Sequence, residues 1–252
     1  MSDSHAIATT GEHAVGQDSI HEHPPYQRHH FVSMDQQNET VNFGMWLFLL
    51  TEIMFFGGLF TAYLIYRNWY YPAFVAGSHQ LDIVLGSFNT LLLITSSFTM
   101  AMGVWCAETK RSKGLVLSLI ATLILGAGFM GIKADEYHEK YVKHHVPGHT
   151  FDWKGFTNPS PEEIKNGDKA LAPDMAQKTE VYFSLYFAMT GMHALHMLIG
   201  IGLLLYMLGK AIRGGYMDGH IAFVENFGLY WHFVDIVWIF LFPLLYLISR
   251  HQ

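Results

Sequence analysis

Three ionisable side chains share one face of the last apolar segment of the chain. Glu225, His232 and Asp235 lie within residues 222–248, a segment that contains no other Asp, Glu, Lys, Arg or His. At about 100° per residue on a helix, the three fall within an arc of roughly 80°. Because one charge at the centre of a membrane helix costs about 2.5–3.5 kcal/mol, this stripe needs buried partners or a chemical function.

Other polar groups interrupt the apolar segments at similar depths. Glu52 lies in the segment 42–66, and His193 and His196 lie in the segment 181–208. At 1.5 Å per residue, Glu52 and His232 are each about 15 Å from the start of their helices, so we expect these two side chains to be able to meet. His193 and His196 are three residues apart and share one face of a helix.

These intramembrane groups leave three interpretations open. The first is a hydrogen-bond network that fixes helix packing, in which Glu52, surrounded by Phe and Leu, is neutral and donates a hydrogen bond. The second is proton acceptance or relay by Glu52, His232 and Asp235, because carboxylates and histidines recur in the proton paths of membrane proteins. The third is metal or haem ligation by His193, His196 and His232.

Two further stretches of the sequence contain residues of the types that bind metals, and both stretches are interpreted as exposed to solvent. Residues 1–41 form a polar tail, predicted to be disordered or extended, in which histidines occur at irregular spacings without a Cys or carboxylate pattern. Residues 135–139 read Asp-Glu-Tyr-His-Glu and are expected at a solvated helix end. We therefore expect neither a metal site nor a catalytic residue on this chain. The histidines of the tail are His5, His13, His21, His23, His29 and His30.

The composition is that of a membrane protein. Of 252 residues, 51% are hydrophobic and 14% are charged, against about 25% charged in soluble proteins. The single Cys106 excludes a disulfide within the chain and a Cys-ligated iron–sulfur cluster. Segments that meet the spanning length of about 20 apolar residues predict an all-α, polytopic bundle of five transmembrane helices in a domain of residues 42–252, with an external loop at 133–178. The segments are residues 42–66, 81–105, 114–132, 181–208 and 222–248.

The distribution of basic residues predicts the orientation. The first connection between spanning segments contains Arg67 but no other Lys or Arg, whereas the second and fourth connections are richer. Because Lys and Arg favour cytoplasmic loops, we expect the N-terminus in the cytoplasm and the C-terminus outside. The basic residues of the second and fourth connections are Lys110, Arg111, Lys113, Lys210 and Arg213.

The chain resembles subunit III of the haem–copper cytochrome c oxidases over residues 42–248, where the matching segments occur in the same order. The most specific segment is 230–238, which reads Tyr-Trp-His-Phe-Val-Asp-Ile-Val-Trp. Other matching segments are 43–56 around Glu52, Asn89-Thr90, Glu-Tyr-His-Glu at 136–139, and Gly-Met-His-Ala-Leu-His at 191–196.

The resemblance implies a non-catalytic subunit of a proton-pumping terminal oxidase in aerobic electron transport. Such a subunit carries no haem or copper, stabilises catalytic subunit I and supports proton uptake, so the chain takes part in oxygen reduction through its complex. The implied partners are subunits I and II, which hold the haem and copper, and cytochrome c through the complex, with a small subunit IV as a further candidate. We expect no nucleic-acid partner.

Members of this family also hold phospholipid in a cleft. Lys210 and His220 match positions where the family places basic residues near the headgroups, and both lie in a loop expected in the cytoplasm, which suits an anionic headgroup. The chain lacks the first two helices of the seven-helix members, which form one wall of that cleft, so another subunit would have to supply this wall. Five helices favour a bacterial inner (plasma) membrane over the mitochondrial one.

Two alternative functions remain at this point. One is subunit III of a quinol oxidase or of a complex similar to nitric oxide reductase, because these relatives share much of the pattern. The other is an independent proton-coupled transporter that uses Glu52 as its proton carrier. Transporters of this kind are commonly built from inverted repeats, and the sequence shows no internal repeat.

Overall fold

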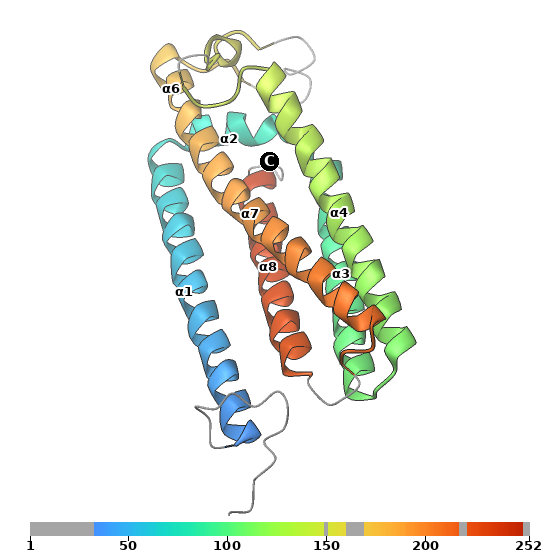
Figure 1. Cartoon of the computed structure of the whole chain (residues 1–252). Helices are drawn as coiled ribbons and strands as arrows, with labels where there is room; N and C mark the ends of the chain where they lie inside the picture. Colours follow the sequence, from blue (N-terminus) through green and yellow to red (C-terminus); the bar gives the residue numbers. More distant parts are fainter. Residues whose placement is uncertain (1–32, 149–150, 160–168, 217–220, 249–252) are drawn as a thin grey trace, which may run out of the picture. The chain divides into compact units, whose positions relative to one another are not determined.

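The computed structural model describes residues 33–148, 151–159, 169–216 and 221–248 (Figure 1). No strand occurs in this part of the chain, and five of its helical segments are long and apolar enough to cross a membrane. The predicted all-α, polytopic membrane bundle is thereby confirmed. The elements are α1 (Met34–Trp69), α2 (Tyr71–His79), α3 (Ile83–Glu108), α4 (Ser112–Val142), the 3-10 helix η1 (Lys154–Phe156), α6 (Pro173–Gln177), α7 (Thr179–Ile212) and α8 (Ala222–Tyr246).

The chain divides into two compact units between Val41 and Asn42. The first eight residues of α1 belong to the N-terminal unit, and the remainder of α1 and all other elements belong to the second. Residues 1–32, with the six histidines of the predicted tail, lie outside the described residues.

Two helices extend furthest beyond their predicted ends. The first was expected to start at residue 42 but begins at Met34, because the Ser33 hydroxyl accepts a hydrogen bond from the backbone N–H of Gln36 and caps it. The third spanning helix was expected to end at residue 132, which is wrong, because α4 continues to Val142. The external loop predicted at 133–178 therefore starts after α4 and contains η1 and α6.

The extension of α4 follows from its buried face. Phe129, Lys133, Glu136 and Lys140 recur at the spacing of a helical face, and all four are buried. Three of the four are charged, so a search for apolar residues alone ends the helix too early. Burial of these charged side chains requires partners on other helices.

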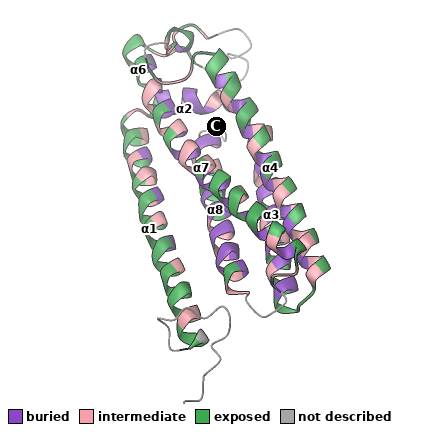
Figure 2. Ribbon diagram, viewed as in Figure 1, coloured by how far each residue is buried: buried purple, intermediate pink, exposed green. Residues whose placement is uncertain are grey.

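The core is built around α8. Trp231 and Trp238 of this helix are fully buried. In its most apolar 18-residue stretch, 50% of the residues are buried, compared with 17% in the corresponding stretch of α1 (Figure 2). Trp231 reaches across to α3, where its indole N–H donates to the Ser96 hydroxyl at 2.9 Å. Gly200 of α7 makes room for this indole, since a Cβ atom there would lie 2.9 Å from the ring.

Two tyrosine hydroxyls satisfy backbone carbonyls at the end of α8. Tyr63 of α1 donates to the carbonyl of Leu244 at 2.6 Å, and Tyr182 of α7 donates to the carbonyl of Leu245 at 3.0 Å. The last carbonyls of a helix have no partner within the helix, and an unsatisfied carbonyl costs several kcal/mol in the hydrocarbon region. These bonds fasten α1 and α7 to the end of α8, which stops at Tyr246 rather than at the predicted residue 248.

Replacing Tyr63 with Phe is expected to lower the free energy of unfolding by about 1 kcal/mol, because it leaves the Leu244 carbonyl without its donor. Denaturant unfolding of the purified protein in detergent would measure the change. Tyr66→Phe is the matched control, since Tyr66 lies on the same helix and its side chain is exposed. Equal losses in the two variants would contradict this role of the Tyr63 hydroxyl.

Candidate functional site

The intramembrane carboxyl of α1 pairs with a histidine of α7. Glu52 Oε2 lies 3.1 Å from His196 Nε2, and the two side chains are 19% and 11% exposed. The Phe56 ring, one turn along α1, lies 5.5 Å from the imidazole. The polar pair is therefore partly enclosed by an apolar ring of α1. Glu52 and His232 were expected to be able to meet. The structure shows instead that the hydrogen-bond partner of Glu52 is His196.

The hydrogen bonds of His196 determine how many protons the pair holds. The Nδ1 atom lies 2.8 Å from the carbonyl oxygen of Met192, and a carbonyl can only accept, so Nδ1 carries a hydrogen. The contact between Nε2 and Glu52 then contains one further proton, held either by the carboxyl group or by the imidazole. In both forms the pair has no net charge, which suits its position inside the membrane.

His232 and Asp235 face α3 instead. The Nδ1 atom of His232 lies 2.6 Å from the Ser97 hydroxyl. Asp235 is buried, and the same Ser97 hydroxyl lies beside its carboxyl group. Neither carboxyl oxygen accepts a hydrogen bond of ordinary geometry within the described chain. Within the described chain, the Ser97 hydroxyl is thus a hydrogen-bond partner of His232 and a neighbour of Asp235.

Glu225 belongs to a different environment from the other two stripe residues. It lies in the first turn of α8 and is half-buried. A carboxylate in the first turn interacts favourably with the positive end of the helix dipole. The three residues of the predicted stripe share a helix face, but Glu225 lies at the helix end while His232 and Asp235 lie in its interior.

His193 is separated from His196 by the packing of the bundle. Its ring lies 5.5 Å from the Phe129 ring and 5.2 Å from the Trp238 ring, and neither ring nitrogen has a hydrogen-bond partner within the described chain. His196 instead faces α1. Two histidines three residues apart on α7 therefore point to different neighbouring helices.

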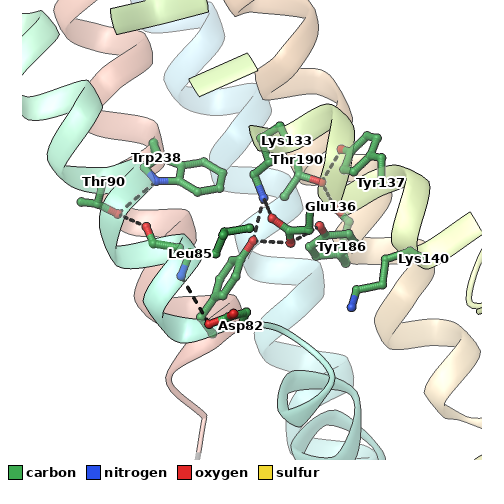
Figure 3. Close-up of polar contacts among 12 residues, drawn as sticks. Asp82, Leu85, Thr90, Lys133, Glu136, Tyr137, Lys140, Tyr186, Thr190 and Trp238 are labelled. Atoms are coloured by element: carbon green, nitrogen blue, oxygen red, sulfur yellow. Dashed lines mark hydrogen bonds and ion pairs between the residues drawn. The ribbon is translucent and has the colours of Figure 1, made fainter. Parts of the chain in front are cut away.

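A second polar cluster joins α4, α7 and α8 (Figure 3). Lys133 Nζ lies 2.8 Å from Glu136 Oε2 and 2.6 Å from the Tyr246 hydroxyl. The hydroxyls of Tyr186 and Tyr246 each donate to Glu136 Oε1 at 2.6 Å. The Lys133 and Glu136 side chains are each 5% exposed, so this is a buried ion pair.

Aromatic rings surround the ammonium group of this pair. Lys133 Nζ lies 4.5 Å from the centroid of the Trp238 ring, 5.2 Å from that of Tyr246 and 5.7 Å from that of Tyr186. The negative faces of aromatic rings attract a cation, and the attraction increases when water is excluded. Hydrogen bonds and ring contacts together replace the water that the ammonium loses on burial.

This cluster corrects the interpretation of residues 135–139 as a solvated helix end. Glu136 lies inside α4 and is buried, whereas Glu139 is half-exposed and pairs with Lys143 at 2.6 Å. The sequence pattern does not single out Lys133, because it lies beyond the predicted end of the helix. The spacing of Lys133, Glu136 and Lys140 on one face is the pattern that would have revealed a buried polar stripe.

The third interpretation from the sequence was metal or haem ligation by His193, His196 and His232. No three His, Cys, Asp or Glu side chains within residues 33–148, 151–159, 169–216 and 221–248 are grouped so as to hold a metal ion. His193 is enclosed by Phe129 and Trp238, and both ring nitrogens of His196 already have partners. The side chains that were considered as haem ligands thus fit hydrogen bonding and packing.

The two predicted lipid-binding residues have different outcomes. The Lys210 ammonium lies over the Tyr216 ring, 4.7 Å from its centroid. Burial raises the pKa of Tyr216 from its usual 10 to about 12. His220 lies outside the described residues. The role of both residues in lipid binding stays a prediction.

Comparison with known proteins places the chain in a family. The family model described as cytochrome c oxidase subunit III matches residues 12–151 and 172–250. These ranges include the Glu52–His196 pair, the cluster around Lys133 and the segment from Tyr230 to Trp238.

Individual relatives agree with this match. A cytochrome c oxidase subunit 3 of Thermostichus vulcanus is 29% identical over 241 residues, covering 94% of each chain. The corresponding protein of Synechocystis sp. is 33% identical over 208 residues, covering 82% of this chain and 75% of the relative. A quinol oxidase subunit 3 of Bacillus subtilis is 29% identical over 219 residues, covering 86% and 92%. The chain therefore belongs to the cytochrome c oxidase subunit III family and is a multi-pass membrane subunit of an oxidase complex.

Proposed function

We propose that the chain is the non-catalytic subunit III of a proton-pumping cytochrome c oxidase in a bacterial inner membrane. It stabilises subunit I and supports proton uptake, while haem, copper and the reaction with oxygen reside in subunits I and II. Cytochrome c would deliver electrons to the complex, and a small subunit IV would complete it. The positive-inside distribution of Lys and Arg supports an N-terminus in the cytoplasm and a C-terminus outside.

The Glu52–His196 pair is the observation that supports a role in proton uptake. It holds one proton between two groups whose joint charge is zero, at a largely buried position within the membrane-spanning part of α1 and α7. Either group can take the proton while Nδ1 keeps its bond to Met192. If such a pair releases its proton as it takes up another from water, its net charge remains zero, whereas either transfer alone would leave a charge in the membrane.

The buried clusters on α3, α4, α7 and α8 support the structural part of the proposal. Their polar groups bind one another, as in the Lys133 cluster, or are enclosed by aromatic rings, as is His193. α1 instead presents large apolar side chains to its surroundings along much of its length (Figure 2). This combination suits a rigid bundle that packs against lipid and other subunits.

Purification through an affinity tag on this chain tests the proposal. From native membranes in a mild detergent, we expect subunits I and II to co-purify with haem and copper and to reduce oxygen with reduced cytochrome c. The matched control is the tagged chain expressed alone, which we expect to show no haem absorbance. Stoichiometric haem in the isolated chain, or isolation of the chain from native membranes without any oxidase subunit, would contradict the proposal.

A quinol-oxidising complex is the second candidate. It is favoured by the match to the quinol oxidase subunit 3 of Bacillus subtilis, which covers 86% of this chain. The same purified complex distinguishes the two donors. Oxygen consumption with a quinol but not with reduced cytochrome c would support the second candidate and exclude the first.

A further inference from the structure

An imidazole in the middle of a spanning helix reaches the outer surface of the chain. His232 is half-buried, and its Nδ1 atom lies 2.6 Å from the Ser97 hydroxyl of α3. The other ring nitrogen, Nε2, has no hydrogen-bond partner among the described residues and is not enclosed by them. At 1.5 Å per residue, His232 lies about 15 Å from the start of α8 at Ala222, so Nε2 is far from both ends of the helix.

The surface around this nitrogen is otherwise apolar. Ile236 and Ile239 follow the histidine along the same face of α8, and both side chains are exposed. On α3, the exposed side chains of Ile94 and Phe98 flank Ser97. An imidazole nitrogen on such a surface in the membrane has no water to bond with, so another molecule must supply its partner.

Small side chains beside the imidazole allow another helix to approach closely. Ser97 and Ala101 are four residues apart on α3, and Ala101 is exposed. Pairs of small residues at this spacing recur where membrane helices pack against one another. This part of α3 therefore suits contact with the backbone of a further helix.

The hydrogen-bonding capacity of Nε2 decides between a lipid and a protein on this surface. An acyl chain has neither a donor nor an acceptor, so it would leave the nitrogen without a partner. A polar side chain on a membrane helix can bond to it, as polar side chains do across pairs of membrane helices. Nε2 donates if Nδ1 accepts from Ser97, and accepts if Nδ1 donates to it. A hydroxyl or a carboxamide can serve in either case, because each contains both a donor and an acceptor.

We propose that a membrane helix of another oxidase subunit docks on the α3–α8 face around His232, and that a hydroxyl or carboxamide side chain of this helix forms a hydrogen bond with Nε2. The proposal rests on the proposed function, which makes the chain one subunit of an oxidase. Ser97 fixes the orientation of the imidazole through Nδ1 and thereby presents Nε2 to the partner. This surface is separate from the Glu52–His196 pair, which joins α1 to α7.

Photo-crosslinking from this face tests the docking. The photoreactive amino acid p-benzoylphenylalanine replaces Ile236 in the full chain, native membranes are irradiated, and adducts purified through a tag on this chain are identified by mass spectrometry. We expect an adduct with a membrane helix of another oxidase subunit. Adducts with lipid alone, or with a second copy of this chain, would overturn the proposal.

The matched control carries the same photoreactive amino acid at Leu198. This side chain is exposed on α7, at a depth similar to that of the test position, because the neighbouring Gly200 contacts Trp231 of α8. We expect no adduct with the helix that is labelled from Ile236. The same adduct from both positions would overturn the assignment of the partner helix to the α3–α8 face.

Two substitutions of His232 test the hydrogen bond itself. The amide of Asn lies near the position of Nδ1 and can keep the bond to Ser97, but it leaves nothing at Nε2, whereas the longer Gln reaches the position of Nε2. We expect His232→Asn to lower the fraction of this chain retained by the oxidase through detergent washing about tenfold, because the partner side chain loses its hydrogen bond. We expect His232→Gln to retain most of it.

His138→Asn is the control for the substitution, since His138 is exposed on α4, and it is expected to leave retention unchanged. Equal retention of His232→Asn and His232→Gln would overturn the role of Nε2. The unaltered chain separates this inference from the proposed function. Its isolation without any oxidase subunit would refute the function, whereas co-purification without a protein adduct from Ile236 would refute the docking surface alone.

Discussion

Replacing Lys133 with Met is expected to lower the free energy of unfolding by about 3–5 kcal/mol, because it leaves the carboxylate of Glu136 buried without its counter-charge. The two side chains form an ion pair at 2.8 Å and are each 5% exposed. The hydroxyls of Tyr186 and Tyr246 remain as donors to Glu136 but carry no positive charge. Denaturant unfolding in detergent would measure the loss.

The matched control is Lys143→Met on the same helix. Lys143 forms an ion pair with Glu139 at 2.6 Å, but the two side chains are 49% and 51% exposed. Exposed pairs contribute about 0–1 kcal/mol, so the control is expected to change stability little. Similar losses in Lys133→Met and Lys143→Met would show that burial does not determine the effect.

A double variant separates the ion pair from the rest of the cluster. Adding Glu136→Gln to Lys133→Met removes the unpaired charge and keeps an oxygen that can accept from Tyr186 and Tyr246. We therefore expect the double variant to recover most of the stability lost in the single variant, because replacing both partners of a buried pair is often nearly neutral. A double variant as unstable as the single one would refute this explanation.

Replacing Glu52 with Leu is expected to lower the free energy of unfolding by about 1–3 kcal/mol, because Nε2 of the largely buried His196 loses its partner. Glu52→Gln is expected to cost less than about 1 kcal/mol, since its amide can donate to Nε2 while Nδ1 keeps its bond to Met192. Unfolding in detergent and the amount of complex recovered from membranes would both report this order. Equal losses in the two variants would contradict the hydrogen bond as the source of stability.

The same pair of variants tests the proposed role in proton uptake. Glu52→Gln keeps a hydrogen bond but cannot release a proton at physiological pH, so the assembled complex is expected to take up protons more slowly at unchanged haem content. A pH-sensitive dye in stopped-flow turnover would measure this rate. Normal proton uptake by Glu52→Gln, together with normal assembly, would restrict Glu52 to a structural role.

The helical segments could be predicted from the sequence because each depends on a property of consecutive residues. Apolar stretches long enough to span a membrane lie at all five expected places. The predicted ends fail where polar residues continue a helix, as in α4, whose last turns contain Lys133, Glu136 and Lys140. Hydropathy measures the cost of placing an unpaired residue in lipid, and a partner of opposite charge offsets much of that cost for a buried side chain.

The candidate site was predictable only as a set of residue types. Glu52, His193, His196, His232 and Asp235 were recognisable as costly groups within apolar segments. The depth of each residue along its helix was compatible with several pairings, including that of Glu52 with His232. Depth does not specify the rotation of a helix about its axis, so it cannot select among partners at one level.

The sequence by itself determined that this protein is an all-α, multi-pass membrane subunit, because composition, segment length and residue order are properties of the chain. Only the tertiary structure decided that Glu52 pairs with His196, that His232 and Asp235 face Ser97, and that Lys133 lies buried against Glu136. The physical reason is that each of these contacts depends on the rotation and packing of two or more helices. Hydrogen bonds from side chains of other helices offset the free-energy cost of burying a polar group. The spacing of residues within one helix does not reveal which side chains form these bonds.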